Sequence, residues 1–331
     1  MASGRSSAEP GLGGGAASGR PDPAPLLRPC SIAVVGASER PGAYGDVVLR
    51  NLAAAGFPGE VWGVNPGREG EEVHGRPCVA SLAALPGPVD AAFVAIPAAG
   101  VPQVVREAGE LGCGGAIVVS AGFGETAAGR VLEAELREAA LAGGLALCGP
   151  NGNGVVAVAA RAPLWGDSVG PLAAGPVALV TQSGNVGVNA LASRRGIGFH
   201  TVVSTGNQAV LEASDWIEAI CELDGVGSIA LFLEADGDGE RLAAALACCA
   251  ERGIGVVALK VGSSAAGARA AGAHTGALAG DQRVFAALLE EAGAALAEDP
   301  GELLELARAL AAPRSRPRRD GGLAILTCSG G

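Results

Sequence analysis

Short apolar runs alternate with Ala-, Leu- and Glu-rich stretches of helical length from Ser31 onward. This alternation is typical of βα units that build a parallel sheet. One set of such units fills the first half of the chain, and a second set follows a Pro- and Gly-rich crossing at residues 162–176. The pattern therefore predicts an α/β protein with two sheets, the first of them doubly wound.

Each set has its own expected strands and helices. In the first set we expect strands at 31–38, 61–66, 91–97, 116–122 and 145–151, and helices near 43–55, 100–111 and 126–143. In the second set we expect strands at 177–184, 199–207, 228–234 and 255–262. The helices expected there are one that ends near 195 and others near 213–222, 239–252, 280–292 and 301–311.

These elements suggest four regions. The low-complexity run of Gly, Ala, Ser and Pro at residues 1–28 offers little for a core to bury, so we expect a disordered tail there. We expect the first domain at 29–160 and the second at 161–312. Residues 313–331 are expected to hold a linker and the first strand of a third domain that is truncated or absent.

The composition narrows the functional classes. The 331 residues carry a formal net charge of -11, and the sequence pI is about 4.8. Binding of nucleic acid through a basic face is therefore not expected. No apolar run reaches the ~18 residues that a membrane-spanning helix needs, so no membrane partner is expected either. All basic residues are arginines except Lys260.

The cysteine pattern favours free thiols. None of the eight cysteines forms a CxxC pair or stands at zinc-ligand spacing from a histidine, so no metal site is expected. The N-terminus has no continuous apolar segment of the kind that signal peptides contain. Free thiols at this density are typical of a reducing compartment, and the cytoplasm is the expected location. We expect these residues to be small buried hydrophobes: Cys30, Cys78, Cys113, Cys148, Cys221, Cys248, Cys249 and Cys328.

Candidate ligand-binding residues follow the strands of the first set. In open α/β sheets, ligands bind beyond the carboxyl ends of the strands. The turns found there consist of small residues and exposed backbone, which predicts a crevice for a nucleotide-like ligand. Ordinary tight βα turns are the alternative, and the first turn lacks the GxGxxG spacing of dinucleotide-binding folds. The turns are Gly36-Ala37-Ser38, Asn65-Pro66-Gly67-Arg68, Ile96-Pro97-Ala98 and Ser120-Ala121-Gly122-Phe123.

One turn of the second set is a candidate anion site. The run Thr181-Gln182-Ser183-Gly184-Asn185-Val186-Gly187 follows an apolar strand and opens a helix. Free N–H groups and the helix dipole at such a terminus favour a phosphate, and Gly184 permits close approach of the backbone. The alternative is a helix that Ser183 caps with its own hydroxyl.

His274 is a candidate nucleophile. It lies in AAGARAAGAHTGALAG at 265–280, where Gly272 and Gly276 remove bulk that would shield the imidazole. An exposed imidazole accepts a phosphoryl group if a carboxylate fixes its tautomer, and Glu234 at the end of SIALFLE is the best-placed carboxylate. The alternatives are a structural histidine and a solvated or helix-capping acid. Two further histidines are expected to be structural, namely His74 and His200.

Nine motifs together resemble a known family. They are VVGASERPGAYG, VWGVNPGREG, AAFVAIPA, SAGFGE, GPNGNG, VTQSGNVG, STGNQA, LFLEADGDG and LKVGSSAAGARAAGAHTGALAG. With these motifs in family order, the chain from about Cys30 onward resembles the nucleoside-diphosphate-forming acyl-CoA synthetases, relatives of the succinyl-CoA synthetase alpha subunit and the ADP-forming acetate-CoA ligases. The resemblance implies a Rossmann-like CoA-binding domain followed by a flavodoxin-like succinyl-CoA-ligase domain.

The resemblance also implies roles for individual residues. His274 corresponds to the histidine that becomes phosphorylated, and Glu234 to the acid that orients it. The implied phosphate site comprises Gln182, Ser183, Gly184, Asn185, Thr275 and Gly276. The implied CoA site comprises Gly36, Ala37, Ser38, Val64, Asn65, Pro66, Arg68, Ile96, Pro97, Ser120, Ala121, Gly122 and Asn151.

Four positions depart from the family pattern. Gly152 and Asn153 stand where the family usually has Cys and then Leu or Pro, Asn185 where Ala is common, and Val210 where an acid is usual. Because Gly152 and Asn153 adjoin the expected acyl site, the identity of the acyl group stays open.

The resemblance implies the alpha-type part of an acid-CoA ligase, in which acyl-CoA, phosphate and ADP give a carboxylic acid, CoA and ATP. CoA would bind to this chain, and ADP or ATP with Mg to an ATP-grasp domain or beta subunit. An oligomer is expected. One alternative is a CoA-binding regulatory module of an acetyltransferase-type protein. Such a module does not require a phosphoryl-accepting histidine, so the presence of His274 argues against this alternative. A nicotinamide-dependent oxidoreductase is a weaker alternative, because GxGxxG and its acidic ribose partner are absent.

Overall fold

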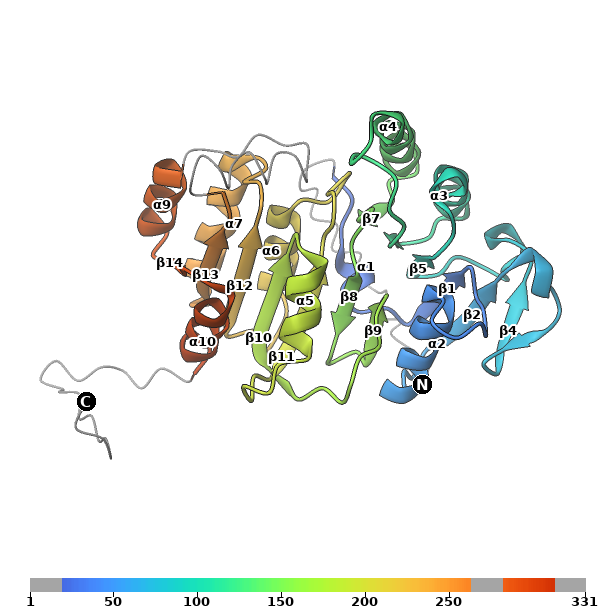
Figure 1. The fold of residues 1–331 in the computed structure, drawn as a ribbon, viewed down its shortest axis with the longest axis horizontal. Helices are drawn as coiled ribbons and strands as arrows, with labels where there is room; N and C mark the ends of the chain where they lie inside the picture. Colours follow the sequence, from blue (N-terminus) through green and yellow to red (C-terminus); the bar gives the residue numbers. More distant parts are fainter. Residues whose placement is uncertain (1–19, 263–281, 313–331) are drawn as a thin grey trace, which may run out of the picture.

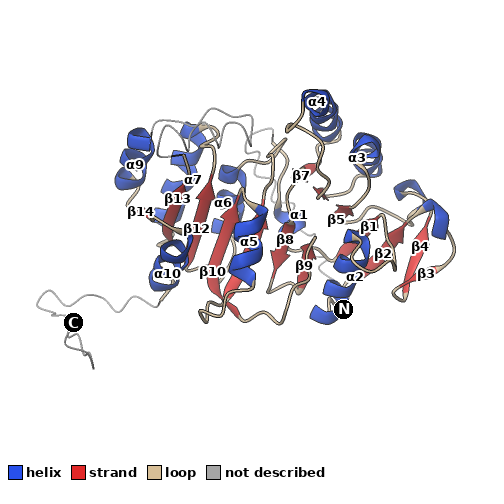
Figure 2. Cartoon of the chain, in the orientation of Figure 1, coloured by secondary structure: helices blue, strands red, loops and turns tan. Residues whose placement is uncertain are grey.

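The computed structural model describes residues 20–262 and 282–312, and these form two sheets with helices on both faces (Figures 1 and 2). Each sheet is mostly parallel, so the expected α/β organisation is confirmed. Several of the expected helices end at glycines in the left-handed conformation, such as Gly56 (φ 63°) and Gly112 (φ 80°). Within the described ranges, no helix combines the length and apolarity that crossing a membrane requires.

The first sheet has the strand order β3-β4-β2-β1-β5-β6-β7, and only β3 and β4 pair antiparallel. Its strands are β1 (Ser31–Val35), β2 (Glu60–Val64), β3 (Glu72–Val73), β4 (Arg76–Val79), β5 (Ala91–Val94), β6 (Gly115–Val118) and β7 (Ala146–Cys148). Helix α2 (Tyr44–Ala55) packs on the face that includes Ile32 and Val34. Helices α3 (Val101–Leu111) and α4 (Ala127–Ala142) cover the face of Ala33 and Val35, because successive strand residues point to opposite sides.

The second sheet has the strand order β14-β13-β12-β10-β11-β8-β9. Its strands are β8 (Gly154–Ala157), β9 (Ala162–Trp165), β10 (Ala174–Thr181), β11 (Phe199–Ser204), β12 (Ser228–Leu233), β13 (Gly255–Lys260) and β14 (Ala295–Leu296). Helices α5 (Gly184–Leu191) and α10 (Pro300–Leu310) cover one face. Helices α6 (Ala213–Cys221), α7 (Gly239–Glu251) and α9 (Gln282–Glu291) cover the other.

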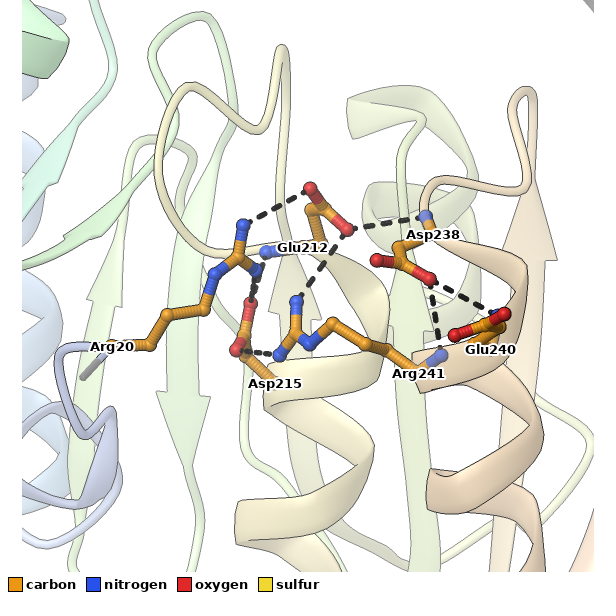
Figure 3. Close-up of polar contacts among 6 residues, drawn as sticks. All are labelled: Arg20, Glu212, Asp215, Asp238, Glu240 and Arg241. Atoms are coloured by element: carbon orange, nitrogen blue, oxygen red, sulfur yellow. Dashed lines mark hydrogen bonds and ion pairs between the residues drawn. The ribbon is translucent and has the colours of Figure 1, made fainter. Parts of the chain in front are cut away.

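The expectation of a disordered tail at 1–28 is wrong for its last residues. Helix α1 (Ala24–Leu27) is ordered, and its Leu26 and Leu27 are buried. They reach the core because Gly114 and Gly115 leave room beside β6, where an added Cβ would lie within 3 Å of Pro25 or Leu26. Arg20 pairs with Glu212 and Asp215 at the start of α6, so this segment is tied to both sheets (Figure 3).

The hairpin of β8 and β9 was not expected. Both strands pair antiparallel at the edge of the second sheet, on either side of the expected domain boundary at 160. Four-residue strands give too short a pattern for recognition, and Pro163 in β9 is tolerated because β9 is an edge strand. The strands β3, β4 and β14 were not predicted for the same reason, since they have only two to four residues. The expected linker and strand at 313–331 lie outside the described residues.

Candidate functional site

A crevice opens at the carboxyl ends of β1, β2 and β5. Its volume is about 840 Å³, within the ~300–1,000 Å³ that ligand pockets usually have. Predicted residues that line this crevice are Gly36, Ser38, Val64, Asn65, Pro66, Ile96 and Pro97. Lining residues that the sequence analysis missed include Arg40, Tyr44, Ser81, Leu82 and Glu107. The missed residues come from loops and helix surfaces whose position depends on the packed fold.

The turn after β1 depends on glycines. Gly36 has φ 86°, and a Cβ there would lie 2.4 Å from the Ala95 carbonyl oxygen. A Cβ on Gly45 would lie 2.1 Å from the carbonyl oxygen of Gly36. The turn after β1, the end of β5 and the start of α2 are therefore in backbone contact, with no room for a side chain at position 36 or 45. This cradle fits a nucleotide-like ligand.

Two arginines near the crevice differ in their surroundings. Arg68, a predicted CoA residue, pairs with Glu39 at 3.4 Å and Glu71 at 3.1 Å and does not line the crevice. Arg40 lines the crevice, and its guanidinium makes no hydrogen bond or ion pair within the part of the chain that the structure describes. Arg40 is therefore the better candidate for contacting a phosphate group.

Other predicted CoA residues either do not line the crevice themselves or serve to hold the turns around it. Ala37 is fully buried in the core. Asn65, although it lines the crevice, uses its side chain to hold the turn, donating to the Ala37 carbonyl at 2.8 Å. The Ser120 hydroxyl donates to the carbonyl of Ile96, so the turn that also contains Ala121 and Gly122 is fastened to the end of β5.

A second, polar pocket of about 310 Å³ lies where the carboxyl ends of β10, β11 and β12 meet the segment after β7. It brings together the predicted residues Gln182, Ser183, Gly184, Asn185, Glu234 and Asn151. It also includes Asn153, which was expected to adjoin the acyl site, and five residues that were not predicted as site residues, namely Asp167, Gly206, Asn207, Gln208 and Ala235. No predicted strand or motif placed Asp167 at this point, because only the packing of the two sheets brings its loop here. Asn207 ends the predicted strand at 199–207 and lies in the motif STGNQA, but it was not predicted as a site residue.

The start of α5 forms one wall of this pocket. Ser183 is the N-cap residue, but its hydroxyl makes no capping hydrogen bond, so the alternative of a self-capped helix is not supported. Thr181 holds the turn instead, since its hydroxyl donates to the Ser183 carbonyl and accepts from the Ser183 N–H, both at 3.0 Å. The first N–H groups of a helix lack intrahelical partners and favour an anion.

Asparagines connect the pocket to neighbouring elements. Asn153 Nδ2 donates to Asp167 Oδ2 at 2.9 Å. Asn151, in the left-handed conformation with φ 58°, donates to Asn207 Oδ1 at 3.3 Å. Asn207 in turn donates to Glu133 of α4 at 2.7 Å. The pocket wall is thus connected to the first domain by side-chain amides.

The unusual positions Gly152 and Val210 have different surroundings. A Cβ on Gly152 would lie 2.5 Å from the Ser204 carbonyl oxygen, so this site admits no side chain without a shift of the backbone. Val210 is buried among the apolar residues of the first domain and does not line the pocket. Asn153 and Asn185, by contrast, face the pocket.

The predicted residues His274, Thr275 and Gly276 lie outside the described residues. His200 is structural, as predicted: Nε2 donates to the Asp224 carbonyl at 3.1 Å, and Nδ1 lies 2.9 Å from the Thr201 hydroxyl. His74 Nε2 lies 2.9 Å from Asp46 Oδ1.

The described cysteines are free thiols. Most are buried as predicted, and burial raises the pKa of Cys148 to about 12. Cys30 is exposed, contrary to the prediction, and Cys248 is half-buried.

Two family profiles match the chain. The profile described as a CoA binding domain matches residues 30–157, and the one described as a succinyl-CoA ligase like flavodoxin domain matches residues 174–310. The profile matches therefore agree with the two sheets and with the Rossmann-like and flavodoxin-like organisation that the motifs implied.

Two relatives are similar to the chain over most of its length. An ADP-forming acetate-CoA ligase I of Archaeoglobus fulgidus is 37% identical over 309 residues, which cover 92% of this chain and 44% of the relative. The alpha subunit of the ADP-forming acetate-CoA ligase I of Pyrococcus furiosus is 34% identical over 313 residues, covering 92% of this chain and 66% of the subunit.

A solved structure of an acetyl-coenzyme A synthetase 1 from Ca. Korarchaeum cryptofilum, in complex with phosphate and ADP, superposes with a TM-score of 0.82 at 31% identity. The match covers 88% of this chain and 62% of that one. The chain thus spans about half to two thirds of the length of these relatives. It belongs to the family of nucleoside-diphosphate-forming acyl-CoA synthetases, of which it carries the CoA-binding and succinyl-CoA-ligase-like flavodoxin domains.

Proposed function

We propose that this chain is the alpha-type part of an ADP-forming acid-CoA ligase, with CoA in the crevice of the first domain and phosphate at the start of α5. The observation that carries the proposal is the polar pocket, in which the Ser183-Gly184 turn and Glu234 line one cavity although they come from different strands. An anion site next to a carboxylate is what transfer of a phosphoryl group to an imidazole requires.

The first step is attack of a phosphate oxygen on the thioester carbonyl carbon of acyl-CoA. The carbon–sulfur bond breaks, a carbon–oxygen bond to phosphate forms, and the thiolate of CoA takes up the proton that phosphate releases. The N–H groups at the start of α5 hold the phosphate during this step, and the absence of a side chain on Gly184 lets it approach the backbone.

The second step transfers the phosphoryl group to His274. A neutral ring nitrogen attacks phosphorus, the bond between phosphorus and the acyl oxygen breaks, and the carboxylic acid leaves as its anion. Glu234 accepts a hydrogen bond from the other ring nitrogen, which sets the tautomer and stabilises the positive charge that develops on the ring.

Completion of the reaction needs a second nucleotide-binding unit. We propose an ATP-grasp domain or a beta subunit that binds ADP or ATP with Mg and receives the phosphoryl group from His274. The relatives extend beyond the matched region, and one of them was solved with phosphate and ADP, which supports this division of labour. The free thiols support a reducing, cytoplasmic location.

The test is to incubate the chain with acetyl-CoA and radiolabelled phosphate and to measure an acid-labile, base-stable label on the protein. We expect one label per chain that persists until ADP and an ATP-grasp partner are added. Glu234→Gln should slow labelling by roughly 10²-fold. Glu240→Gln, which neutralises an exposed carboxylate on α7, is the matched control and should not change the rate. A label that persists in His274→Ala would refute the assignment.

A further inference from the structure

Glu234 lies just outside the sheet, and its position depends on how the following turn is held. Strand β12 ends at Leu233, and the next residues, Glu234, Ala235 and Asp236, leave the sheet. The hydrogen bonds of a parallel ladder therefore do not fix the backbone of Glu234. Two side chains at the ends of the neighbouring strands contact this turn instead: Gln182, which directly follows β10, and Lys260, the last residue of β13.

Gln182 holds the first half of the turn. Its Oε1 accepts from the N–H of Glu234 at 2.7 Å and from the N–H of Ala235 at 2.9 Å. Its Nε2 donates to the carbonyl of Ala235, also at 2.9 Å. The backbone N–H of Gln182 is used as well, since it donates to the carbonyl of Phe232 at 3.0 Å. The amide side chain is thus bound to the turn at three points and is poorly placed to act mainly as a phosphate ligand.

Lys260 holds the second half of the turn. It is the last residue of β13, stands in register with Leu233 of β12, and its Nζ lies 2.6 Å from Asp236 Oδ2. The Lys260 side chain is only 1% exposed, and its ammonium also lies 5.0 Å from the centre of the Phe285 ring.

Lys260 is also the sole lysine of a chain whose other basic residues are arginines. An ammonium is compact, whereas a guanidinium is a broad planar fork, so the two are not interchangeable in a packed site.

We propose that Gln182 and Lys260 are positioning residues that fix Glu234 from the carboxyl ends of β10 and β13, the two strands that flank β12. The inference rests on the proposed function, because it concerns the carboxylate that orients the phosphoryl-accepting imidazole. A displacement of about 1 Å at a reacting group costs on the order of 10²-fold in rate, so release of either contact should slow phosphoryl transfer without loss of ligand binding.

A double-mutant cycle between Gln182 and Glu234 tests the first contact. Gln182→Met keeps the length of the side chain and removes all three hydrogen bonds. We expect it to slow the labelling of the chain roughly tenfold or more, with an unchanged dissociation constant for CoA. In the Glu234→Gln background, the same substitution should slow labelling by less than about twofold, because a residue that acts through Glu234 loses its effect once Glu234 is disabled. Equal effects in both backgrounds would overturn the proposal.

The second contact is tested by removing the whole ion pair, because loss of one buried partner alone endangers folding. The combined variant Lys260→Met with Asp236→Asn should keep its near-ultraviolet circular dichroism and slow labelling roughly tenfold. The matched control removes an exposed pair, Arg195 and Glu305, by Arg195→Met with Glu305→Gln, and should label at the parental rate. A parental rate in the Lys260 and Asp236 variant would overturn the role of Lys260.

The labelling results distinguish failure of the inference from failure of the proposed function. If the parent chain takes up no label, or takes it up without His274, the function and the inference both fall. If the parent is labelled on His274 but the cycle is additive, only the inference falls.

Discussion

Arg20 Nη1 lies 3.0 Å from Asp215 Oδ2, although 195 residues separate the two in sequence (Figure 3). Asp215 also pairs with Arg241 of α7, and its carboxylate accepts from the N–H of Glu212 at 2.7 Å. This aspartate therefore joins three parts of the chain: the segment before α1, the start of α6 and the start of α7. Because Leu26 of the adjoining helix α1 packs against the first sheet, residues 20–27 connect both sheets.

Substitution of Arg20 and substitution of Asp215 should lower the free energy of unfolding by different amounts. Arg20→Ala leaves Asp215 paired with Arg241, so we expect the free energy of unfolding to fall by less than about 1 kcal/mol, as for other partly exposed ion pairs. Asp215→Ala leaves two arginines without that partner and removes the hydrogen bond to Glu212, so its cost should be clearly larger. Urea unfolding of both variants measures the difference. An equal loss in the two would mean that Asp215 has no connecting role.

Arg40 should matter more for CoA than Arg68. Since Glu39 and Glu71 already neutralise Arg68, Arg68→Ala should leave CoA affinity nearly unchanged. Arg40→Ala should weaken binding about tenfold or more, the usual effect of losing a charge-assisted hydrogen bond to phosphate. Calorimetry with CoA and with dephospho-CoA checks this, because the difference should shrink for the ligand that lacks the 3′-phosphate if Arg40 contacts that group. A stronger effect of Arg68→Ala would reverse the assignment.

A side chain at position 184 should block phosphate capture. A Cβ on Gly184 would lie 3.0 Å from Asn153 Oδ1, and the larger valine side chain would enter the space in front of the helix terminus. Gly184→Val should therefore abolish labelling and leave CoA affinity intact. Gly239→Val is a suitable control, because it also alters the first turn of a helix and an added Cβ there meets nothing within 4 Å. Parental labelling of Gly184→Val would show that the anion binds elsewhere.

His200 should contribute to the acid sensitivity of the fold. Burial lowers the pKa of His200 below its ordinary value of 6.5, although the carbonyl of Asp224 opposes this shift. As pH falls below 6.5, His200 becomes protonated in the unfolded state before it does so in the folded state. The contribution of neutral His200 to stability is therefore present above pH 6.5 and is lost as pH falls towards the lower pKa of the folded state. His200→Gln should flatten the decline in stability between about pH 7 and pH 5. Unfolding midpoints across this range test it, and an unchanged slope would exclude His200 as a source.

Local patterns in the sequence were sufficient to predict most of the architecture. The buried strands contain continuous apolar runs, such as IALFL at 229–233 in β12, and runs of that kind indicate parallel strands without any knowledge of their neighbours. The carboxyl-end rule then placed Gly36, Ser183 and Glu234 at sheet edges, where the structure has them.

Tertiary structure alone decided which of these residues meet. Asp167 belongs to a loop without a recognisable pattern, and it reaches the polar pocket because the β8 and β9 hairpin joins the second sheet. Asn207 ends a predicted strand, but its contacts with Asn151 and Glu133 come from segments far away in the sequence. Gln182 could be read as a phosphate ligand from its motif, but its hydrogen bonds to Glu234 and Ala235 depend on the pairing of β10 with β12. Sequence periodicity reports which side chains are buried, whereas the partners of a polar side chain depend on contacts between segments far apart in the chain.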